Sequence, residues 1–447
     1  MRRAVLEHLE AVEQLLRRSW AGGIVAEAGV GAGVTLKMGD GGTPLPLQSA
    51  LGRVLANDLV APLDLPPFAN SQMDGYAIYL EAEQPENIDL DKSTVYGVAE
   101  TIAAGAVPQR LAAGQAAPIM TGAMMPLGAN AVVPIELALP AHFGAPGENV
   151  ELPATTVGKF VRAQGSDVQR GSVVIAGGTL INAAHVGLAA ALGCTELAVR
   201  AKPRVLLLTT GDEVLAPGDS MAGAGLPPGM IFDANESLLR ASLTQAGVEV
   251  VRSHVVRDDP EALLRLLDSY VGEDQLLNGA SGPCCDLIIS VGGISAGAFE
   301  VIRQALGEPS SEAAVDFVSV ALQPGGPQAL GTYRGIPFIG FPGNPVSAFV
   351  SFEMFLRPAL GMLLGAPAPR QRVVATLEHP IISPVGKQQV RRGIYSGPEF
   401  ESAPSVREIG GESSHLLGAL AQANALISIP AGVTELQAGA KVEVWLL

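Results

Sequence analysis

The sequence predicts a multi-domain chain that combines an α/β domain with β-rich parts. The 447 residues are too many for one ordinary hydrophobic core, so two to four domains are expected. Between residues 203 and 363, strand patterns alternate with helix patterns, which predicts a mostly parallel sheet covered on both faces. Residues 370–447 carry strand patterns joined by turns, which predicts a small closed or sandwich β domain.

The α/β part has the clearest pattern. Asp259 is placed as an N-cap with Pro260 at the first helical position, which predicts a helix running to about Val271. Further helices are expected at Asn235–Gln245 and Pro345–Leu363. The expected strands are Arg204–Leu208, Val248–Val255, Leu287–Ile289, Phe317–Leu322 and Phe338–Phe341.

The N-terminal half is less regular. Apolar residues at helical spacing predict a helix over residues 4–20, and residues 21–42 form a glycine-rich stretch with no functional signal. Residues 81–163 contain short alternating runs broken by glycine and proline, which predicts a small β-rich lobe. Helical spacing returns at Leu180–Leu192.

Composition excludes several classes of function. The hydrophobic fraction of 48% is too high for a disordered chain, and the formal net charge of -16 offers no basic stripe for nucleic acid. The three cysteines fit neither a zinc site nor a disulfide framework, which favours a reducing, cytoplasmic setting. We expect no signal peptide and no membrane span.

Two loops are candidate anion sites. Ser290–Glu300 contains Gly292, Gly293 and Gly297 between a strand and a helix, a geometry in which backbone N–H groups can hold a phosphate. On this stretch alone, an ordinary strand-to-helix turn would be the preferred interpretation. The second loop is Phe341–Ser347.

Polar residues collect at the predicted strand ends. Ligands of such sheets bind beyond the carboxyl ends of the strands, and carboxylates from separate loops suit a hard cation such as Mg²⁺. The alternative is that these are surface acids of an acidic protein. The group comprises Thr209, Asp212, Glu213, Asp233, Ser295, Glu300, Asn344 and Ser347. The six histidines are scattered singly, so we expect them to be core or surface residues.

Seven motifs in order resemble the molybdopterin molybdenumtransferases, the bacterial counterparts of the gephyrin E domain. The resemblance runs from about Pro44 to Leu447. The motifs are Pro66-Pro-Phe-Ala-Asn-Ser-Gln-Met-Asp-Gly-Tyr-Ala, Ile119-Met-Thr-Gly-Ala, Thr210-Gly-Asp-Glu, Ile231-Phe-Asp-Ala-Asn, Gly292-Gly-Ile-Ser-Ala-Gly, Phe341-Pro-Gly-Asn-Pro-Val-Ser-Ala and Ser413-Ser-His-Leu-Leu.

The resemblance implies an elongated chain of four domains. These are an N-terminal linking domain (residues 1–63 and 166–202), a β-rich lobe (64–165), an α/β molybdopterin-binding domain (203–367) and a C-terminal β-barrel (368–447). It also implies insertion of molybdate into adenylylated molybdopterin with Mg²⁺ and release of AMP. The expected assembly is a homodimer with its active site between subunits, in possible contact with the molybdopterin adenylyltransferase.

The resemblance also implies site residues, which are assigned where this sequence matches a motif position of the family. Glu213 and Asp233 are expected as metal or catalytic carboxylates, and Glu300 stands where the family usually has Asp. Asp74 and Asp167 are expected to be catalytic residues that come from the partner-facing side. The alternative for Asp74 is that it only forms the turn before the strand Tyr76–Tyr79. The expected ligand-binding residues are Thr121, Gly211, Gly292, Gly293, Ser295, Gly297, Pro342, Asn344, Pro345, Ser347, Arg392 and Ser414.

Besides Glu300, the sequence departs from the family pattern at three positions. Ala298 replaces a usual Asp, and Gln323 and Gly326 replace two lysines. Either another cation compensates, or the chain is a paralogue that binds molybdopterin as a scaffold without turnover. A third, weaker alternative is an adenylyltransferase acting one step earlier. The candidate cations are Arg370, Lys387, Arg391 and Arg392.

Overall fold

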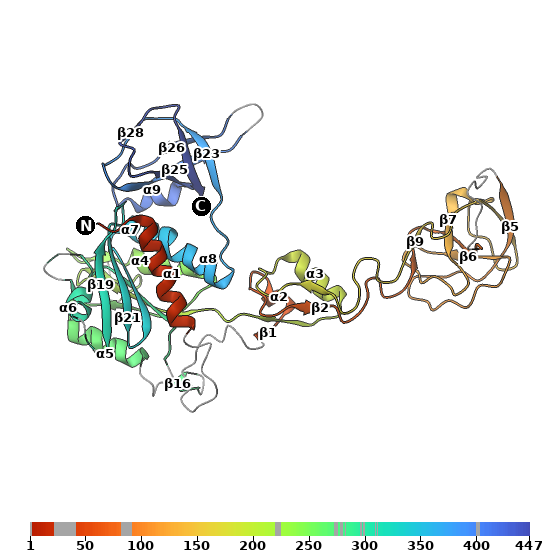
Figure 1. The fold of residues 1–447 in the computed structure, drawn as a ribbon, viewed down its shortest axis with the longest axis horizontal. Coiled ribbons are helices and arrows are strands. Elements are labelled where there is room, and N and C mark those ends of the chain that lie inside the picture. Colours follow the sequence, from red (N-terminus) through yellow and green to blue (C-terminus); the bar gives the residue numbers. More distant parts are fainter. Residues whose placement is uncertain are drawn as a thin grey trace.

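The computed structural model shows an elongated molecule with a body at one end, a lobe at the other and a narrow arm between them (Figure 1). The structure describes residues 2–21, 42–81, 92–219, 225–271, 276–277, 280–281, 283–295, 297, 300–308, 310, 312–398 and 403–447. Most of the glycine-rich stretch at 21–42 and the departure at Ala298 lie outside these residues. The multi-domain α/β plus β architecture predicted from the sequence is confirmed.

A six-stranded sheet forms the centre of the body. Its strands lie in the order β15-β12-β18-β22-β21-β19. The first four are mutually parallel, and β21 pairs antiparallel with both of its neighbours, β22 and β19. The sheet is therefore mostly parallel, as predicted. The strands are β12 (Arg204–Thr210), β15 (Glu249–Val256), β18 (Leu287–Val291), β19 (Ala313–Ser319), β21 (Pro327–Tyr333) and β22 (Ile336–Phe341).

Helices cover both faces of this sheet. Strand side chains alternate between faces, so Val205 and Leu207 of β12 pack into one core while Leu206 and Leu208 pack into the other. The first core includes residues of α4 (Ala234–Gln245), α7 (Pro345–Ser351), the π-helical turn η3 (Phe352–Leu356) and α8 (Arg357–Leu364). The second includes α5 (Pro260–Val271) and α6 (Val301–Leu306). The predicted Asp259 cap of α5 is present, since its Oδ1 accepts a hydrogen bond from Ala262 N at 3.0 Å.

Helix α1 (Val5–Ala21) belongs to the body, which corrects our placement of it in the linking domain. Its residues Val12 and Leu16 are fully buried in the first core, and α1 packs against η3 and α8. Trp20 donates a hydrogen bond from Nε1 to Asp286 O at 3.0 Å. The helical spacing predicted the helix itself, but it could not identify the surface that the apolar face would meet.

The run α7–η3–α8, Pro345–Leu364, is long and apolar enough to span a membrane by length and composition. About two thirds of this apolar stretch, 67%, is buried inside the protein. Val346, Phe352 and Phe355 are fully buried in the first core. The run is therefore placed as a core helix of the body.

The arm is a small domain built from two segments of the chain. Two short antiparallel pairings, β1 with β11 and β2 with β10, join the outgoing and returning segments. Its elements are β1 (Thr43–Pro46), α2 (Leu47–Ala50), β2 (Leu59–Val60), β10 (Val173–Ile175), α3 (Ala183–Ala191) and β11 (Glu196–Val199).

The lobe at the far end is rich in strands, as predicted. Its main sheet has the order β7-β4-β6-β5-β8, and β3 and β9 form a second, short pairing. The elements are β3 (Asn70–Ser71), β4 (Gly75–Ile78), β5 (Ser93–Val98), β6 (Gln115–Ile119), β7 (Ala131–Pro134), the 3-10 turn η1 (Ile135–Leu137), β8 (Asn149–Pro153) and β9 (Val161–Arg162).

The C-terminal domain is a closed barrel that sits on the body (Figure 1). The order β25-β26-β23-β29-β27 is closed by pairing of β27 with β25, which confirms the predicted barrel. Its elements are β20 (Leu322–Gln323), β23 (Arg372–Leu377), β24 (Ile381–Ile382), β25 (Gln388–Ser396), β26 (Ser405–Glu408), α9 (Leu417–Gln422), β27 (Ala425–Ile429), β28 (Glu435–Leu436) and β29 (Lys441–Leu446).

Candidate functional site

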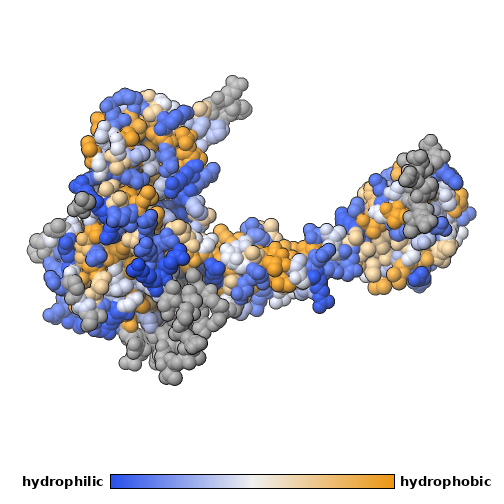
Figure 2. Space-filling model, in the orientation of Figure 1, coloured by the Kyte–Doolittle hydropathy of each residue, from blue (hydrophilic) through white to orange (hydrophobic). Residues whose placement is uncertain are grey.

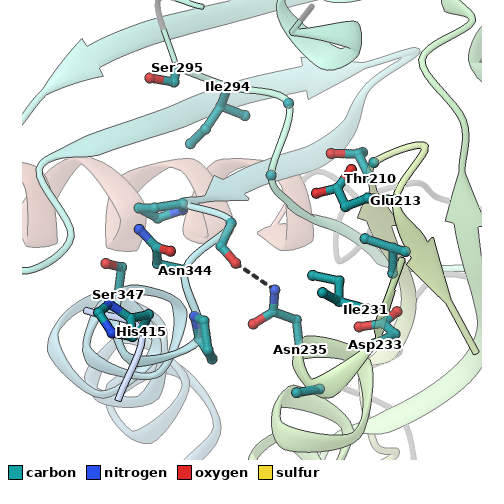
Figure 3. Close-up of a pocket in the computed structure, with 18 of the residues that line it drawn as sticks. Thr210, Glu213, Ile231, Asp233, Asn235, Ile294, Ser295, Asn344, Ser347 and His415 are labelled. Atoms are coloured by element: carbon teal, nitrogen blue, oxygen red, sulfur yellow. Dashed lines mark hydrogen bonds between the residues drawn. The ribbon is translucent and has the colours of Figure 1, made fainter. Parts of the chain in front are cut away.

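An open cavity of about 690 Å³ lies at the carboxyl edge of the parallel strands. Four loops line it: residues 210–214 after β12, 231–235 before and into α4, 292–295 after β18, and 342–345 after β22. This is the position at which open α/β sheets bind ligands. We call it the main pocket. Figure 3 shows side chains from these loops pointing toward one another across it.

The glycine loop after β18 forms one wall of the main pocket. Gly292 and Gly293 have φ of 88° and 68°, which L side chains rarely adopt. A Cβ on Gly292 would lie 2.6 Å from Thr210 Oγ1, so a side chain there would collide with the neighbouring loop. Both glycines are therefore required by backbone conformation and space, and they bring main chain to the pocket surface.

Glu300 shapes the same loop. Its Oε2 accepts a hydrogen bond from Ser295 N at 2.9 Å. A Cβ on Gly297 would lie 2.8 Å from Glu300 Oε1, so the glycine makes room for this carboxylate. Ser295 and Glu300 line the main pocket, whereas Gly297 supports it from outside the lining.

Asp233 is a buried N-cap. Its Oδ1 accepts from Glu236 N at 2.9 Å and its Oδ2 accepts from Thr209 Oγ1 at 2.5 Å. The side chain thus fixes the start of α4 and the end of β12 while facing the main pocket. Each oxygen retains one lone pair for a further ligand.

A cluster of carboxylates includes one residue that the sequence analysis missed. Asp258 follows the edge strand β15 and lines the main pocket. Burial is the largest cause that raises the pKa of the Asp258 carboxyl. Repulsion from three neighbouring carboxylates raises this pKa further. Those neighbours are Asp212, Glu213 and Glu300. Carboxylates are therefore gathered at this wall of the main pocket, although the described residues form no group of three that could hold a metal by themselves.

Glu213 is the predicted acid of the first loop. Its carboxylate folds back over Gly211, where a Cβ would lie 2.6 Å from Oε2. Gly211 has φ of 141°, so it accommodates the turn as well as the carboxylate. Both residues line the main pocket.

The second loop is fixed from across the main pocket. Asn235, which the sequence analysis did not assign, donates from Nδ2 to Gly343 O at 2.6 Å (Figure 3). The predicted residues Pro342, Asn344, Pro345 and Ser347 all line this side.

The C-terminal domain contributes a histidine that we had expected to be a core or surface residue. His415 is exposed, lines the main pocket, and lies 2.8 Å from Ser413 Oγ through Nδ1. Val346 N donates to Ser414 O at 3.1 Å, which holds this loop against α7. In the sequence, only the family motif Ser413–Leu417 indicated that the region of His415 could be functional.

Arg392 does not line the main pocket. It is 1% exposed and donates to Ser413 O at 3.0 Å and to Gly411 O at 2.5 Å, so it supports the loop that presents His415. Ser414 instead lines a neighbouring cavity of about 280 Å³, together with Gln323, Gly326 and Lys387. We call this cavity the side pocket.

Three predicted residues lie far from both pockets of the same chain, in or beside the lobe (Figure 1). Thr121 donates to Asp74 Oδ1 from its backbone N at 2.6 Å and from its hydroxyl at 2.8 Å. These hydrogen bonds, the backbone one first, lower the pKa of Asp74. Asp167 is exposed near the arm, where its N donates to Leu65 O. The structure therefore brings Asp74 and Thr121 together, but among the lobe residues that it describes none lines the main pocket.

Comparisons with known proteins agree over most of the chain. Residues 7–193 match the MoeA N-terminal region (domain I and II), residues 206–362 match a probable molybdopterin binding domain, and residues 374–447 match the MoeA C-terminal region (domain IV). Molybdopterin molybdenumtransferase 2 from Mycobacterium tuberculosis is 41% identical over 406 residues, covering 90% of this chain and 94% of the relative.

Other relatives and structures give the same picture. Molybdopterin molybdenumtransferase from a Nostoc species is 33% identical over 417 residues, covering 89% of this chain and 87% of the relative. The crystal structure of a molybdopterin biosynthesis moeA protein from Pyrococcus horikoshii OT3 covers 100% of both chains with a TM-score of 0.73 at 25% identity.

Proposed function

Because the chain belongs to the molybdopterin molybdenumtransferase family, we propose that it is an enzyme that inserts molybdenum during molybdenum cofactor biosynthesis. The observation that supports this most is the main pocket, whose lining contains residues from five of the motifs that carried the resemblance. The resemblance predicted from the sequence is thereby confirmed, and the scaffold alternative is not favoured.

The proposed reaction uses molybdate and adenylylated molybdopterin and releases AMP. Glu213 and Asp258 face the main pocket, and Asp258 has a raised pKa caused in part by neighbouring carboxylates. This donor set fits Mg²⁺, which binds through one or two carboxylates and takes further oxygens from substrate phosphates and water. A bound Mg²⁺ would supply a Lewis acid that polarises a phosphoryl oxygen.

The chain's own residues position that chemistry. Glu213 and Asp258 would hold the cation at the wall formed by the ends of β12 and β15. The glycine loop offers main chain for close approach of a phosphate, and Asn235 fixes the facing loop through Gly343. Asp233 acts as a positioning residue because it ties the end of β12 to α4.

We further propose a homodimer in which the lobe of one copy completes the pocket of the other. The pair Asp74 and Thr121 is preorganised yet remote from the main pocket of its own chain. Figure 2 shows apolar patches on the arm, and its large exposed apolar side chains include Leu51, Val60 and Val173. Such surface suits contact with a second copy. We also propose that the protein contacts the molybdopterin adenylyltransferase and that it is located in the cytoplasm.

The test is AMP release from adenylylated molybdopterin with molybdate and Mg²⁺, followed by chromatography. We expect loss of AMP release with Glu213→Gln and with a chelator. Lys441→Gln, on the exposed barrel surface, is the control. A wild-type protein that binds the substrate without releasing AMP would contradict the proposal and select the scaffold alternative, whereas consumption of ATP would indicate the adenylyltransferase.

The shared site has a separate test. We expect Asp74→Asn and Glu213→Gln each to be inactive, and a mixture of the two proteins to regain part of the activity after subunit exchange. Only a composite site permits this, because one of the two pockets in a mixed dimer would then contain both native carboxylates. A mixture that forms mixed dimers but stays inactive would contradict the sharing of the site.

A further inference from the structure

Two chain segments connect the arm to the lobe (Figure 1). We call them the neck: residues 62–69 run outward from β2 to β3, and residues 163–170 return from β9 toward β10. The structure describes all of these residues, and none of them is buried. The neck therefore has no hydrophobic core of its own, so hydrogen bonds between its two segments must set the direction in which the lobe points.

The backbone joins the two segments of the neck in one place. Leu65 N donates to Val168 O at 2.7 Å, and Val168 N and Asp167 N donate back to Leu65 O at 3.1 and 3.0 Å. Gly165 N donates to Pro66 O at 3.0 Å. The pairing of Leu65 with Val168 is an isolated bridge and not part of a ladder. Such a bridge fixes the separation of the two segments but not the rotation of one about the other.

The Asp64 carboxylate ties the neck on both sides of this bridge. Its Oδ2 accepts from Gln164 Nε2 at 2.8 Å, and its Oδ1 accepts from Arg170 N at 2.8 Å. Gln164 lies on the lobe side of Val168, and Arg170 lies on the arm side. Within the neck, all of which is described, no other side chain forms a hydrogen bond between the two segments. One carboxylate therefore holds three points of the neck in a fixed arrangement.

The returning segment is shaped around this carboxylate. Gly165 has φ of 66°, and a Cβ there would lie 3.3 Å from Cγ and from Oδ1 of Asp64. Glycine thus permits both the turn and the close approach to Asp64. The hydrogen bond from Arg170 N, and next the one from Gln164, lower the pKa of Asp64. The carboxylate is therefore ionised at neutral pH and can accept both hydrogen bonds.

The lobe and the neck carry three of the predicted site residues. Asp74 and Thr121 are joined by hydrogen bonds in the lobe, and Asp167 lies in the neck itself. We propose that Asp64 is a positioning residue that fixes the lobe relative to the arm and so delivers Asp74 and Thr121 to the main pocket of a second copy. The inference rests on the proposed shared site. It gives Asp64 the alignment of the lobe and no contact with substrate.

The first experiment measures the orientation of the lobe in full-length protein without substrate. Nitroxide labels are attached to Thr94→Cys in the lobe and Glu196→Cys in the arm, both exposed positions. Cys194→Ser removes the half-buried native thiol, and Cys284 and Cys285 are buried. Labelled chains are mixed with an excess of unlabelled chains, so that pulsed dipolar spectroscopy reads the distance within one chain.

We expect a narrow distance distribution for the native neck and one about twice as wide for Asp64→Ala, because the released segments adopt several rotations. The matched control is Asp58→Ala. Asp58 Oδ1 accepts from Gly177 N at 2.7 Å, which joins the same two stretches of chain inside the arm, where a hydrophobic core also holds them. This control should leave the width unchanged. An unchanged width in Asp64→Ala, with a melting temperature like the wild type, would overturn the proposal.

A reversed hydrogen bond gives a test by rescue. Gln164→Glu sets two carboxylates against each other and should widen the distribution. Adding Asp64→Asn supplies an amide that donates to the new carboxylate while its oxygen still accepts from Arg170 N, so the native width should return. A double variant that stays as wide as Gln164→Glu alone would show that this contact does not fix the lobe.

Mixed dimers provide the functional readout. In a dimer of one Glu213→Gln chain and one Asp74→Asn chain, the complete pocket takes its lobe from the Glu213→Gln chain. Asp64→Ala in that chain should lower kcat for AMP release about tenfold through misplacement of the lobe, with KM for molybdate unchanged. The same change in the Asp74→Asn chain should have no effect. An equal loss from either chain would indicate general destabilisation and overturn the positioning role.

The outcomes separate this proposal from the proposed function. Wild-type protein that releases no AMP, but whose distance distribution widens in Asp64→Ala, would contradict the enzymatic function and leave Asp64 as the residue that fixes the lobe. Wild-type protein that releases AMP, with a distribution that Asp64→Ala does not widen, would overturn the assignment of Asp64 alone.

Discussion

Acid should weaken the body through His8, a buried histidine of α1. Its side chain is 1% exposed, its ring packs edge-on against Phe355 with centroids 4.6 Å apart, and its Nε2 has no hydrogen-bond partner. Arg3 Nη1 lies 3.4 Å from Nδ1. Burial, and next the charge of Arg3, lower the pKa of His8 from its ordinary 6.5 to about 4. The folded state therefore keeps the ring neutral.

The sign and size of the effect follow from this pKa. Between pH 6.5 and pH 4 the unfolded chain binds a proton at His8 that the folded chain does not, so stability falls as the pH falls through this window. Each tenfold change in proton affinity is worth about 1.4 kcal/mol. We expect His8 to cost about 2 kcal/mol of unfolding free energy at pH 5, and about 3 kcal/mol below pH 4. Above pH 7 it should cost nothing.

The assay compares wild type with His8→Leu, which cannot titrate. The chain has two tryptophans, so a Trp445→Phe background leaves Trp20 of α1 as the only reporter. Urea unfolding followed by Trp20 fluorescence at pH 7.5 and pH 5 should show the wild type losing about 2 kcal/mol more than His8→Leu. An equal loss in both proteins would refute the reasoning.

Three further changes test the core of the body and the positioning of the site. Glu353→Gln should destabilise the body by about 3 kcal/mol, because it leaves the guanidinium of Arg370 without its buried partner; urea unfolding with a midpoint equal to wild type would contradict this. Gly292→Ala should lower stability by about 1–3 kcal/mol and reduce AMP release, since φ is 88° and the Cβ would lie 2.6 Å from Thr210 Oγ1; an unchanged melting temperature would rule out this packing. Asp233→Ala should cost about 1–2 kcal/mol through loss of its capping bond, with calorimetry as the measurement and wild-type stability as the contrary result.

Much of the body was predictable because local patterns and tertiary burial agree there. Continuous apolar strands such as Leu287–Ile289 suit a parallel sheet buried on both faces, and Asp259-Pro260 marks a helix start that the structure confirms. Strand β21 was missed, since Pro327 and Gly331 interrupt its pattern. Its place is set by pairing with β19 and β22, which sequence periodicity cannot show.

The site was predictable where the strand-end rule applies and not where a separate domain contributes. Glu213 and Asn344 follow interior strands of the sheet and line the main pocket as expected. Asp258 follows an edge strand and precedes a helix cap, so its sequence context resembles a solvent-exposed turn. His415 reaches the pocket only because the barrel docks on α7 through Val346 and Ser414, a tertiary contact with no local signature.

The two neighbouring pockets have opposite charge, and this polarity constrains the ligands they can accept together. Carboxylates such as Glu213 and Asp258 line the main pocket, whereas Arg2 and Lys387 line the side pocket, with Ser347 common to both. The proposed cation would be held at the acidic wall of the main pocket. The two sets of charges come from the N-terminal segment, two strand ends and the barrel. The polarity therefore arises from the docking of the domains.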